Sequence, residues 1–401
     1  LSSFFTALVF WPILKWDHAD EKAGVDAGAR ARSDRWIIFL FFMMGLSIGV
    51  HILNLLTIPA IVMVYYYRRY TPTLKGSAIA FVIGCIITGI VQVGVIQYSM
   101  KAAGLFDVFF VNQLGMPFFA GFAVYFLLLA VLIVWALGFN HKNLNPTKLS
   151  IWFILFLTLS FFPFVAVGGM KFFKVLLVAG VGALVGYFFK AGGLKILKLA
   201  LWCYTFIMLG YFMYFTAIIR SNANPVIDMN NVDNPISLVY YLSREQYGSA
   251  PLLYGPHFAA QVDYDENGDP YEYGETRYSK GTDSKTGKDR YITIGRSKEV
   301  RYKSEDKRLF PRIWDPSTEQ YHAQFYADWL DIGRSRDPQT GRETYEAPTY
   351  GQNINWFVTY QNGFMYWRYF MWNFSGKQND IQGYGNKRDG NWITGISFID
   401  N

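Results

Sequence analysis

Residues 36–70, WIIFLFFMMGLSIGVHILNLLTIPAIVMVYYYRRY, decide the fold class of this chain. Trp36–Tyr67 contains no Asp, Glu, Lys or Arg. This apolar run is longer than one bilayer crossing, which needs about 20 residues. Two glycines, a histidine and an asparagine interrupt it near the middle. The pattern predicts two short apolar helices that meet at a polar turn near His51–Asn54.

His51 and Asn54 are candidate substrate-binding residues. An unpaired polar group in hydrocarbon is costly, so irregular backbone and polar side chains inside a membrane must face protein or a wet cavity. The alternative is that both side chains only form hydrogen bonds with neighbouring helices and hold the packing.

The composition changes along the chain. Hydrophobic residues make up 52% and charged residues 17%, and most of the acids lie after residue 219. The split predicts a mainly α polytopic membrane region over residues 1–219, with about eight segments, the first truncated. It also predicts an α+β extracytoplasmic domain over residues 220–401, truncated at its C-terminal side. The net charge of +7 comes partly from residues flanking apolar spans, and no basic run with interleaved aromatics suggests nucleic-acid binding.

Basic residues in the turns predict the orientation of the membrane region. The further apolar spans are Gly76–Tyr98, Met116–Phe139, Leu149–Met170, Val175–Phe189 and Leu199–Ile219. One set of turns contains eight basic residues, namely Arg68, Arg69, Lys75, Lys142, Lys148, Lys190, Lys195 and Lys198. The alternate turns contain only Lys101, Lys171 and Lys174. The first set should be cytoplasmic, which places residues 220–401 on the other side of the membrane.

Lys101–Gly115 falls on the outer side and reads as a short helix lying in the interface. Its apolar residues Leu105, Phe106, Phe109 and Phe110 share one helical face, with Asp107 and Asn112 off it. Asp107 is a candidate for a catalytic acid or a metal ligand. The alternative is that it lies on the wet face of the helix.

The second half alternates helix and strand signals. Helices are predicted over Ile236–Gln246, over Thr318–Ile332 with a cap at Ser317 or Thr318, and over Gln352–Phe374. Ala259–Tyr302 reads as strands joined by turns at Asn267-Gly268 and Thr286-Gly287, and Asp337–Gly341 reads as another turn. The acidic run Asp263–Asp269 looks like half a calcium loop but lacks the Glu at its twelfth position, so a hairpin turn is the plainer interpretation and no metal site is predicted.

The end of the helix predicted over Gln352–Phe374 contains several groups that could bind a substrate. Trp356, Tyr360, Gly363, Phe364, Trp367, Met371 and Phe374 fall on one face, and Arg368 lies beside it. Arg368 could hold a phosphate or carboxylate bidentately, and Trp367 and Trp372 offer flat faces of the kind that stack on sugar rings. Gln378, Asn379 and Asp380 could form an acceptor-binding loop or a simple cap. The alternative is aromatic core packing, with Arg368 tied to an acid such as Asp380.

Three segments resemble one family. They are GLSIGVHILNLLTIPA at Gly45–Ala60, NPISLVYYLSREQYGSAPLLYGP at Asn234–Pro256 and MYWRYFMWNFSGKQND at Met365–Asp380. All look like the bacterial multi-pass membrane family DUF-2723, which is grouped with the membrane O-mannosyltransferases of the GT-C superfamily. The resemblance runs over the whole chain.

The resemblance implies a GT-C-like helix bundle in the bacterial inner membrane. Such an enzyme moves a sugar such as mannose from a polyprenyl-phosphate donor to a hydroxyl of an exported protein or other acceptor. No tightly bound cofactor is implied, and a divalent metal is left open. The catalytic acid of the family is expected upstream of Leu1, so this chain alone should be inactive. Arg244 lies in a family-like segment and is a candidate phosphate ligand, or else an ordinary surface partner of Glu245 or Asp233.

Two other classes of function compete. A non-enzymatic envelope scaffold would use the outer domain to dock a partner. A transporter of lipid-linked sugars would favour paired interrupted helices in two related halves, whereas one interruption, at His51–Asn54, is visible.

Overall fold

The computed structural model describes residues 2–400 except 143, 167–168, 190, 244–250, 285, 316–319, 337–342 and 387. The chain forms two compact units. Unit 1 comprises Leu1–Gln246 with Glu275–Gly295, and unit 2 comprises Tyr247–Gly274 with Arg296–Asn401. The tip of one β-hairpin therefore belongs to unit 1 and its base to unit 2.

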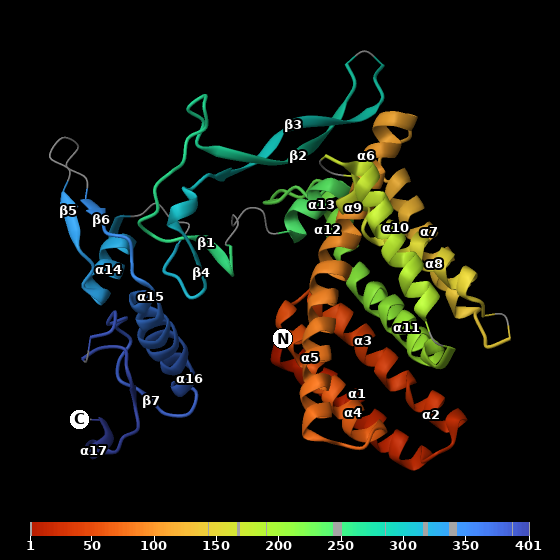
Figure 1. Cartoon of the computed structure of the whole chain (residues 1–401), viewed down its shortest axis with the longest axis horizontal. Coiled ribbons are helices and arrows are strands. Elements are labelled where there is room, and N and C mark those ends of the chain that lie inside the picture. The colour runs from red at the N-terminus through yellow and green to blue at the C-terminus, as the bar shows by residue number, and fades with distance from the viewer. Residues whose placement is uncertain are drawn as a thin grey trace. The chain divides into compact units, whose positions relative to one another are not determined.

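Unit 1 is a helix bundle (Figure 1). Its main helices are α1 (Ser2–Ala23), α2 (Ala27–Ser33), α3 (Arg35–Ile48), α4 (Ile58–Arg69), α5 (Leu74–Gly89), α6 (Ser99–Leu114), α7 (Ala120–Leu137), α8 (Pro146–Ser160), α9 (Phe162–Ala166), α10 (Lys171–Phe188), α11 (Leu194–Tyr211), α12 (Phe215–Asn222) and α13 (Pro235–Leu242). A 3₁₀ turn, η1 (Ile52–Thr57), precedes α4, and a π-helical segment, η2 (Ile90–Tyr98), joins α5 to α6.

Local sequence explains where several of these helices begin. Asn145 caps α8 by accepting a hydrogen bond from Lys148 N at 2.6 Å, and Pro146 follows in the first turn. Asn234 and Pro235 start α13 in the same way, with a full capping box. Such residues satisfy the amide groups that the first helical turn leaves without partners.

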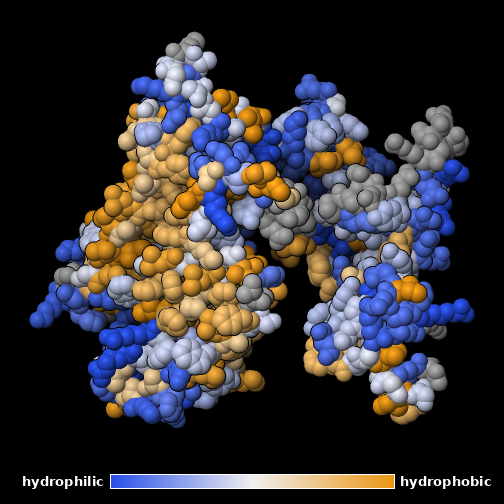
Figure 2. Space-filling model, turned by 180° about the vertical axis from the view of Figure 1, so that it is seen from behind, coloured by the Kyte–Doolittle hydropathy of each residue, from blue (hydrophilic) through white to orange (hydrophobic). Residues whose placement is uncertain are grey.

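Among the described residues, four helices are long and apolar enough to cross a membrane. They are Leu74–Leu114, Ala120–Leu137, Lys171–Phe188 and Leu194–Asn222, and Pro146–Ser160 is a shorter apolar helix. Figure 2 shows a broad hydrophobic surface over the helices of unit 1, with hydrophilic residues gathered toward the ends of the bundle. Unit 1 is thus a multi-pass membrane region, and the fold class expected for the chain is confirmed.

The predicted reversal inside Trp36–Tyr67 is confirmed. Helix α3 ends at Ile48, and His51 Nδ1 accepts from Leu53 N at 3.2 Å before α4 begins. At the other end of this hairpin, five residues form what we call the arginine–carboxylate cluster, namely Asp17, Asp20, Asp34, Arg68 and Arg69. These pairs join the end of α4 to α1 and to Asp34 at the start of α3, so the chain runs out and back.

The two helices are shorter than expected for full crossings. Helix α3 has 14 residues and α4 has 12, whereas a crossing needs about 20. The number of membrane segments, about eight by the sequence pattern, stays a prediction.

Cysteine labelling tests the hairpin and its sidedness. In a Cys85→Ser, Cys203→Ala background, we expect Leu53→Cys to react with an impermeant maleimide from the outer side, because Leu53 is 54% exposed at an irregular turn. Arg32→Cys and Pro72→Cys should react only after the cytoplasmic side is opened. Labelling of positions 32 and 72 from opposite sides would rule out the hairpin.

The span predicted over Gly76–Tyr98 and the interfacial helix predicted over Lys101–Gly115 form one continuous helix, Leu74–Leu114. The expectation of a separate helix lying flat in the interface is therefore wrong. Helix α6 packs against α7 and α13 instead, and Ala102, Ala103 and Val111 are buried.

Glycines set the close packing between helices of unit 1. A Cβ on Gly45 of α3 would lie 2.2 Å from Ile207 O of α11, and one on Gly210 would lie 2.5 Å from Phe42 O. The facing glycines let the two backbones approach within the membrane, as small residues do at helix interfaces there.

Unit 2 is a small α+β region. It contains the strands β1 (Tyr254–Pro256), β4 (Lys307–Leu309), β5 (Arg334–Arg336), β6 (Glu343–Tyr345), β7 (Gly376–Lys377) and β8 (Trp392–Ile393), paired antiparallel as β1–β4, β5–β6 and β7–β8. The long hairpin of β2 (Tyr271–Thr282) and β3 (Asp289–Val300) is shared with unit 1. The helices of unit 2 are α14 (Gln320–Leu330), α15 (Tyr350–Trp356), α16 (Arg368–Met371) and α17 (Ser397–Asp400). The π-helical segment η7 (Phe357–Trp367) lies between α15 and α16.

The core of unit 2 is aromatic. Trp356 stacks on Tyr360 at 4.0 Å between ring centroids, and both contact Phe325 of α14. The predicted caps of α14 and the predicted turn at Asp337–Gly341 lie outside the described residues.

Candidate functional site

The polar turn between α3 and α4 places its two candidates differently. His51 is exposed and caps the turn, whereas Asn54 is 2% exposed. Thr6 Oγ1 of α1 donates to Asn54 Oδ1 at 2.5 Å, and Thr57 Oγ1 donates to Asn54 O at 2.6 Å. Asn54 Nδ2 is buried with no acceptor among the described residues. Asn54 thus links the turn to α1, and its side-chain amide donor has no acceptor among the described residues. Substrate binding by His51 or Asn54 stays a prediction.

Asp107 is not on a wet face, and this expectation is wrong. Asp107 is 0% exposed. Its carboxylate accepts hydrogen bonds from Phe119 N at 3.1 Å and from Phe122 N at 3.2 Å. These amides belong to the start of α7, so Asp107 caps that helix from outside it. A negative charge beside a helix N-terminus is favourable because it complements the helix dipole and the unpaired amide groups.

Tyr291 of β3 completes the contacts of Asp107. Its hydroxyl donates to Asp107 Oδ2 at 2.7 Å, and its backbone exchanges two hydrogen bonds with the Asn112 side chain, at 2.8 and 2.9 Å. Burial and the neighbouring Asp107 carboxylate raise the pKa of the Tyr291 phenol, so it stays a donor at physiological pH. The tip of the hairpin is therefore fastened to α6.

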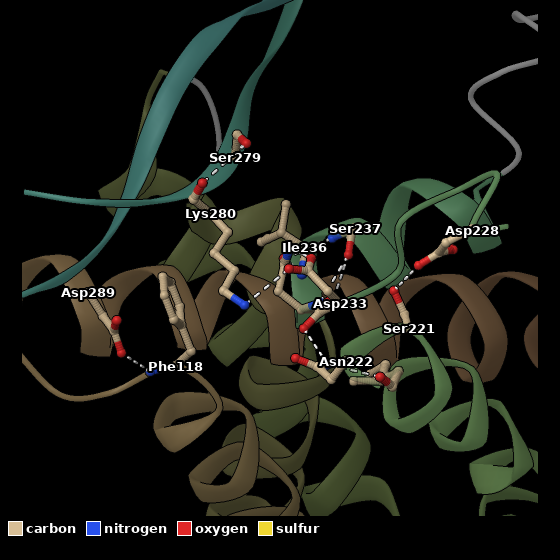
Figure 3. Close-up of polar contacts among 12 residues, drawn as sticks. Phe118, Ser221, Asn222, Asp228, Asp233, Ile236, Ser237, Ser279, Lys280 and Asp289 are labelled. Atoms are coloured by element: carbon tan, nitrogen blue, oxygen red, sulfur yellow. Dashed lines mark hydrogen bonds and ion pairs between the residues drawn. The ribbon is translucent and has the colours of Figure 1, made fainter. Parts of the chain in front are cut away.

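Figure 3 shows the polar contacts that surround this junction in unit 1. Lys280 of β2 reaches Asp233 at 3.0 Å, and Asn222 Nδ2 at the end of α12 donates to Asp233 O at 2.8 Å. Asp289 of β3 accepts from Phe118 N at 3.3 Å, just before α7. These contacts join α12, α13 and the hairpin tip through ordinary ion pairs and caps.

Removing the Tyr291 hydroxyl tests the junction. We expect Tyr291→Phe to lower the unfolding free energy by about 1–3 kcal/mol, because a buried carboxylate loses a donor. Hydrogen exchange in residues 275–295 should speed up with it. Tyr271→Phe is the control, since Tyr271 lies on the same hairpin but is 38% exposed. Equal exchange in both variants would show that the hydroxyl does not fasten the hairpin.

The aromatic helix of unit 2 presents a different face from the one expected. Phe364 is 8% exposed and Arg368 2%, whereas Trp367 is 51% exposed and Phe374 73%. The reason is that η7 is π-helical, and its wider winding rotates the residues that follow it. Arg368 therefore points into the core, where an α-helix would have put Trp367.

The loop after α16 is organised by its own polar side chains. Asn379 Oδ1 accepts from Ile381 N at 3.1 Å and Gly390 N at 3.0 Å, and Gln378 N donates to Asn391 O at 2.9 Å. Asp380 is exposed and pairs with Lys377 at 3.0 Å, so the alternative of an Arg368–Asp380 pair is wrong. Arg244 lies outside the described residues. Substrate binding by Trp367, Gln378, Asn379 and Asp380 stays a prediction.

The described sequence candidates divide between the two units. Unit 1 contains His51, Asn54 and Asp107, and unit 2 contains Trp367, Arg368, Gln378, Asn379 and Asp380. Asp107 lies in a junction with Tyr291 that no local pattern indicated. The arginine–carboxylate cluster includes Arg68 and Arg69, which the sequence analysis considered only as basic residues of a turn. Among the described residues, no group of three or more His, Cys, Asp or Glu comes together as a metal site. In the acidic run, Asp265 Oδ1 instead accepts from Asn267 N and Asp269 N, which makes it the organiser of its own turn.

Two family models match parts of the chain. Residues 1–74 match the N-terminal domain of the protein O-mannosyl-transferase TMEM260. Residues 248–358 match DUF8416, a family of unknown function. No curated protein and no solved structure matches the chain. The first match covers α1–α4 and relates the chain to membrane O-mannosyltransferases, while the likeness to DUF-2723 stays a prediction.

Proposed function

We propose that this chain is part of a GT-C-type membrane glycosyltransferase. It would move a sugar, with mannose the first choice, from a polyprenyl-phosphate donor to a hydroxyl of an exported protein. The single observation that carries the proposal is the match of residues 1–74 to an O-mannosyltransferase domain. The same residues form helices α1–α4, and the arginine–carboxylate cluster joins helices from both ends of the match.

The proposed location is the bacterial inner membrane, with residues 220–401 on the periplasmic side. The eight basic residues of the turns expected in the cytoplasm support this orientation. A sugar phosphate leaving a lipid carrier develops negative charge, which positive or hydrogen-bonding groups at that surface would stabilise.

Asp107 is a poor choice for the catalytic base in this reaction. Its two oxygens are occupied by backbone amides of α7 and by the Tyr291 hydroxyl. A general base must reach the acceptor hydroxyl directly or through one water. We therefore assign Asp107 to the structure of the bundle and not to the chemistry.

A transfer assay tests the proposal. The full-length protein in proteoliposomes would be given radiolabelled polyprenyl-phosphate mannose and a Ser/Thr-rich peptide, with polyprenyl-phosphate glucose as the alternative donor. We expect label in the peptide with a lipid-linked donor and none with a nucleotide sugar. Absence of transfer from either lipid-linked sugar to the peptide, with the protein folded and correctly oriented, would contradict the proposal.

A further inference from the structure

Arg368 is buried in an aromatic cluster of unit 2 (α16 in Figure 1). Its guanidinium carbon lies 3.7 Å from the ring centroid of Phe364, 4.8 Å from Trp372 and 5.1 Å from Tyr369. We call these four residues the Arg368 cluster. The rings offset part of the cost of burying a positive charge through cation–π contacts, but they supply no oxygen acceptor.

The nitrogens of this guanidinium are used unequally. Nη1 donates to Gln382 O at 3.1 Å and to Gly390 O at 3.4 Å. Nε and Nη2 are buried with no acceptor among the described residues. Together they form the edge of the guanidinium whose two parallel N–H groups match a carboxylate or a phosphate.

Other arginines of the chain use the same edge to bind a carboxylate. Arg68 donates from Nε and Nη2 to the two oxygens of Asp17, at 2.5 and 2.7 Å, and Arg69 donates to both oxygens of Asp20 in the same way. The buried Arg312 gives all three of its nitrogens to backbone carbonyls. Of these four arginines, only Arg368 has both nitrogens of the bidentate edge buried without an acceptor among the described residues.

The same cluster contains a third buried donor. Trp372 Nε1 is also buried with no acceptor among the described residues, and Lys377 Nζ lies 4.6 Å from the centroid of the same ring system. None of the ion pairs formed by the described residues involves Arg368. Buried polar groups in native proteins almost always have partners, and a missing one often marks a water or an ion.

We propose that the Arg368 cluster binds a compact oxyanion, a phosphate or a carboxylate. Two anion oxygens would accept from Arg368 Nε and Nη2, and the Trp372 indole would donate a third hydrogen bond. The inference stands on these donors and is independent of the sugar-transfer proposal.

Backbone of the described residues Gln382 and Gly390 flanks the site. Their carbonyls accept from Nη1, and Gly383, Gly385 and Gly390 have positive φ values of 70°, 89° and 68°, which favour glycine. Because Nε and Nη2 are buried, the backbone beside Gln382 and Gly390 must move to admit the anion. Binding should then reduce this motion, since the anion adds hydrogen bonds to Arg368.

Amide hydrogen exchange of the full chain in detergent measures this effect of anion binding. Peptides covering residues 376–393 would be followed while sodium phosphate or sodium acetate replaces sodium chloride at constant ionic strength. We expect one of the two anions to slow exchange in a saturable way. Stronger protection by phosphate identifies a phosphate ligand, and stronger protection by acetate identifies a carboxylate.

Two variants and a matched control separate a binding site from a packing role. Arg368→Lys should weaken the apparent affinity tenfold or more, because lysine cannot offer the bidentate edge. Trp372→Phe should weaken it several-fold while keeping an aromatic ring and the fold. Trp367→Phe is the matched control, because Trp367 is a nearby tryptophan of the same aromatic stretch. Since Trp367 is half exposed, its replacement should leave the apparent affinity unchanged.

If Arg368→Lys fails to fold, Trp372→Phe still decides the question. The proposal is overturned if neither anion slows exchange in residues 376–393. It is equally overturned if Trp367→Phe weakens protection as much as Trp372→Phe does.

Discussion

Replacement of Arg69 by alanine should lower the unfolding free energy of the protein by roughly 3–5 kcal/mol. Arg69 Nη2 lies 2.6 Å from Asp20 and 2.7 Å from Asp34, and the Asp20 side chain is 0% exposed. The guanidinium also packs over the rings of Trp16 and Tyr65, at 5.5 and 5.2 Å. Its removal leaves two carboxylates facing each other with little water to screen them, and breaking a buried pair costs far more than the intact pair contributes.

Thermal or denaturant unfolding in detergent measures this loss. Arg32→Ala is the control, because Arg32 is exposed and its distance to Asp26 is 3.9 Å, so about 1 kcal/mol or less is at stake. Adding Asp20→Asn to Arg69→Ala should restore part of the stability, since it removes a charge that has lost its partner. If Arg69→Ala is as mild as Arg32→Ala, the arginine–carboxylate cluster does not hold the α3–α4 hairpin.

Gly45→Leu should be the next most damaging change, at about 3 kcal/mol, the upper end for an overpacked core. A Cβ at Gly45 would lie 2.2 Å from Ile207 O and 3.1 Å from the Cα of Gly210. Both are backbone atoms, so no side chain can rotate away, and α3 must separate from α11. Separation would also pull at the Tyr214 hydroxyl, which donates to Ile48 O at 3.1 Å.

Gly89→Ala provides the matched control for Gly45→Leu. Gly89 is also a helical glycine of the membrane region, but nothing lies within 4 Å of a Cβ built on it. Alanine is the better helix former, so this variant should be neutral or slightly more stable. Detergent-solubilised protein would be compared by thermal unfolding and by size-exclusion profile. A Gly45→Leu protein with the wild-type melting temperature would contradict the close packing of α3 on α11.

The apolar pattern was enough to predict the membrane region and the reversal at His51–Asn54, because a bilayer constrains length and charge strongly. Turn residues likewise located two turns, at Gly268 and at Gly287, where both glycines have positive φ values, and the second is the tip of the β2–β3 hairpin. Both features depend on neighbours in sequence. They are the kind of information that one sequence carries well.

Asp107 and Arg368 show why the candidate site could not be predicted to the same depth. The partner that buries Asp107 is Tyr291, 184 positions later, and no local pattern indicates that contact. For Arg368, a helical period of 3.6 residues gave the wrong face because η7 is π-helical, and nothing in its composition announced the wider winding. The sequence alone therefore does not tell whether a polar residue beside an apolar stripe faces water or a partner inside the protein.

The division of the β2–β3 hairpin between the two units affects how the protein can be expressed in parts. The polypeptide passes between the units at 246–247, at 274–275 and again at 295–296. A protein begun at Tyr247 would carry residues 275–295 without α6, so Tyr291 and its neighbour Tyr278 would be left uncovered on a two-stranded ribbon, which is marginally stable in water. Soluble production of unit 2 should therefore work better when residues 275–295 are replaced by a short turn such as Asn-Gly.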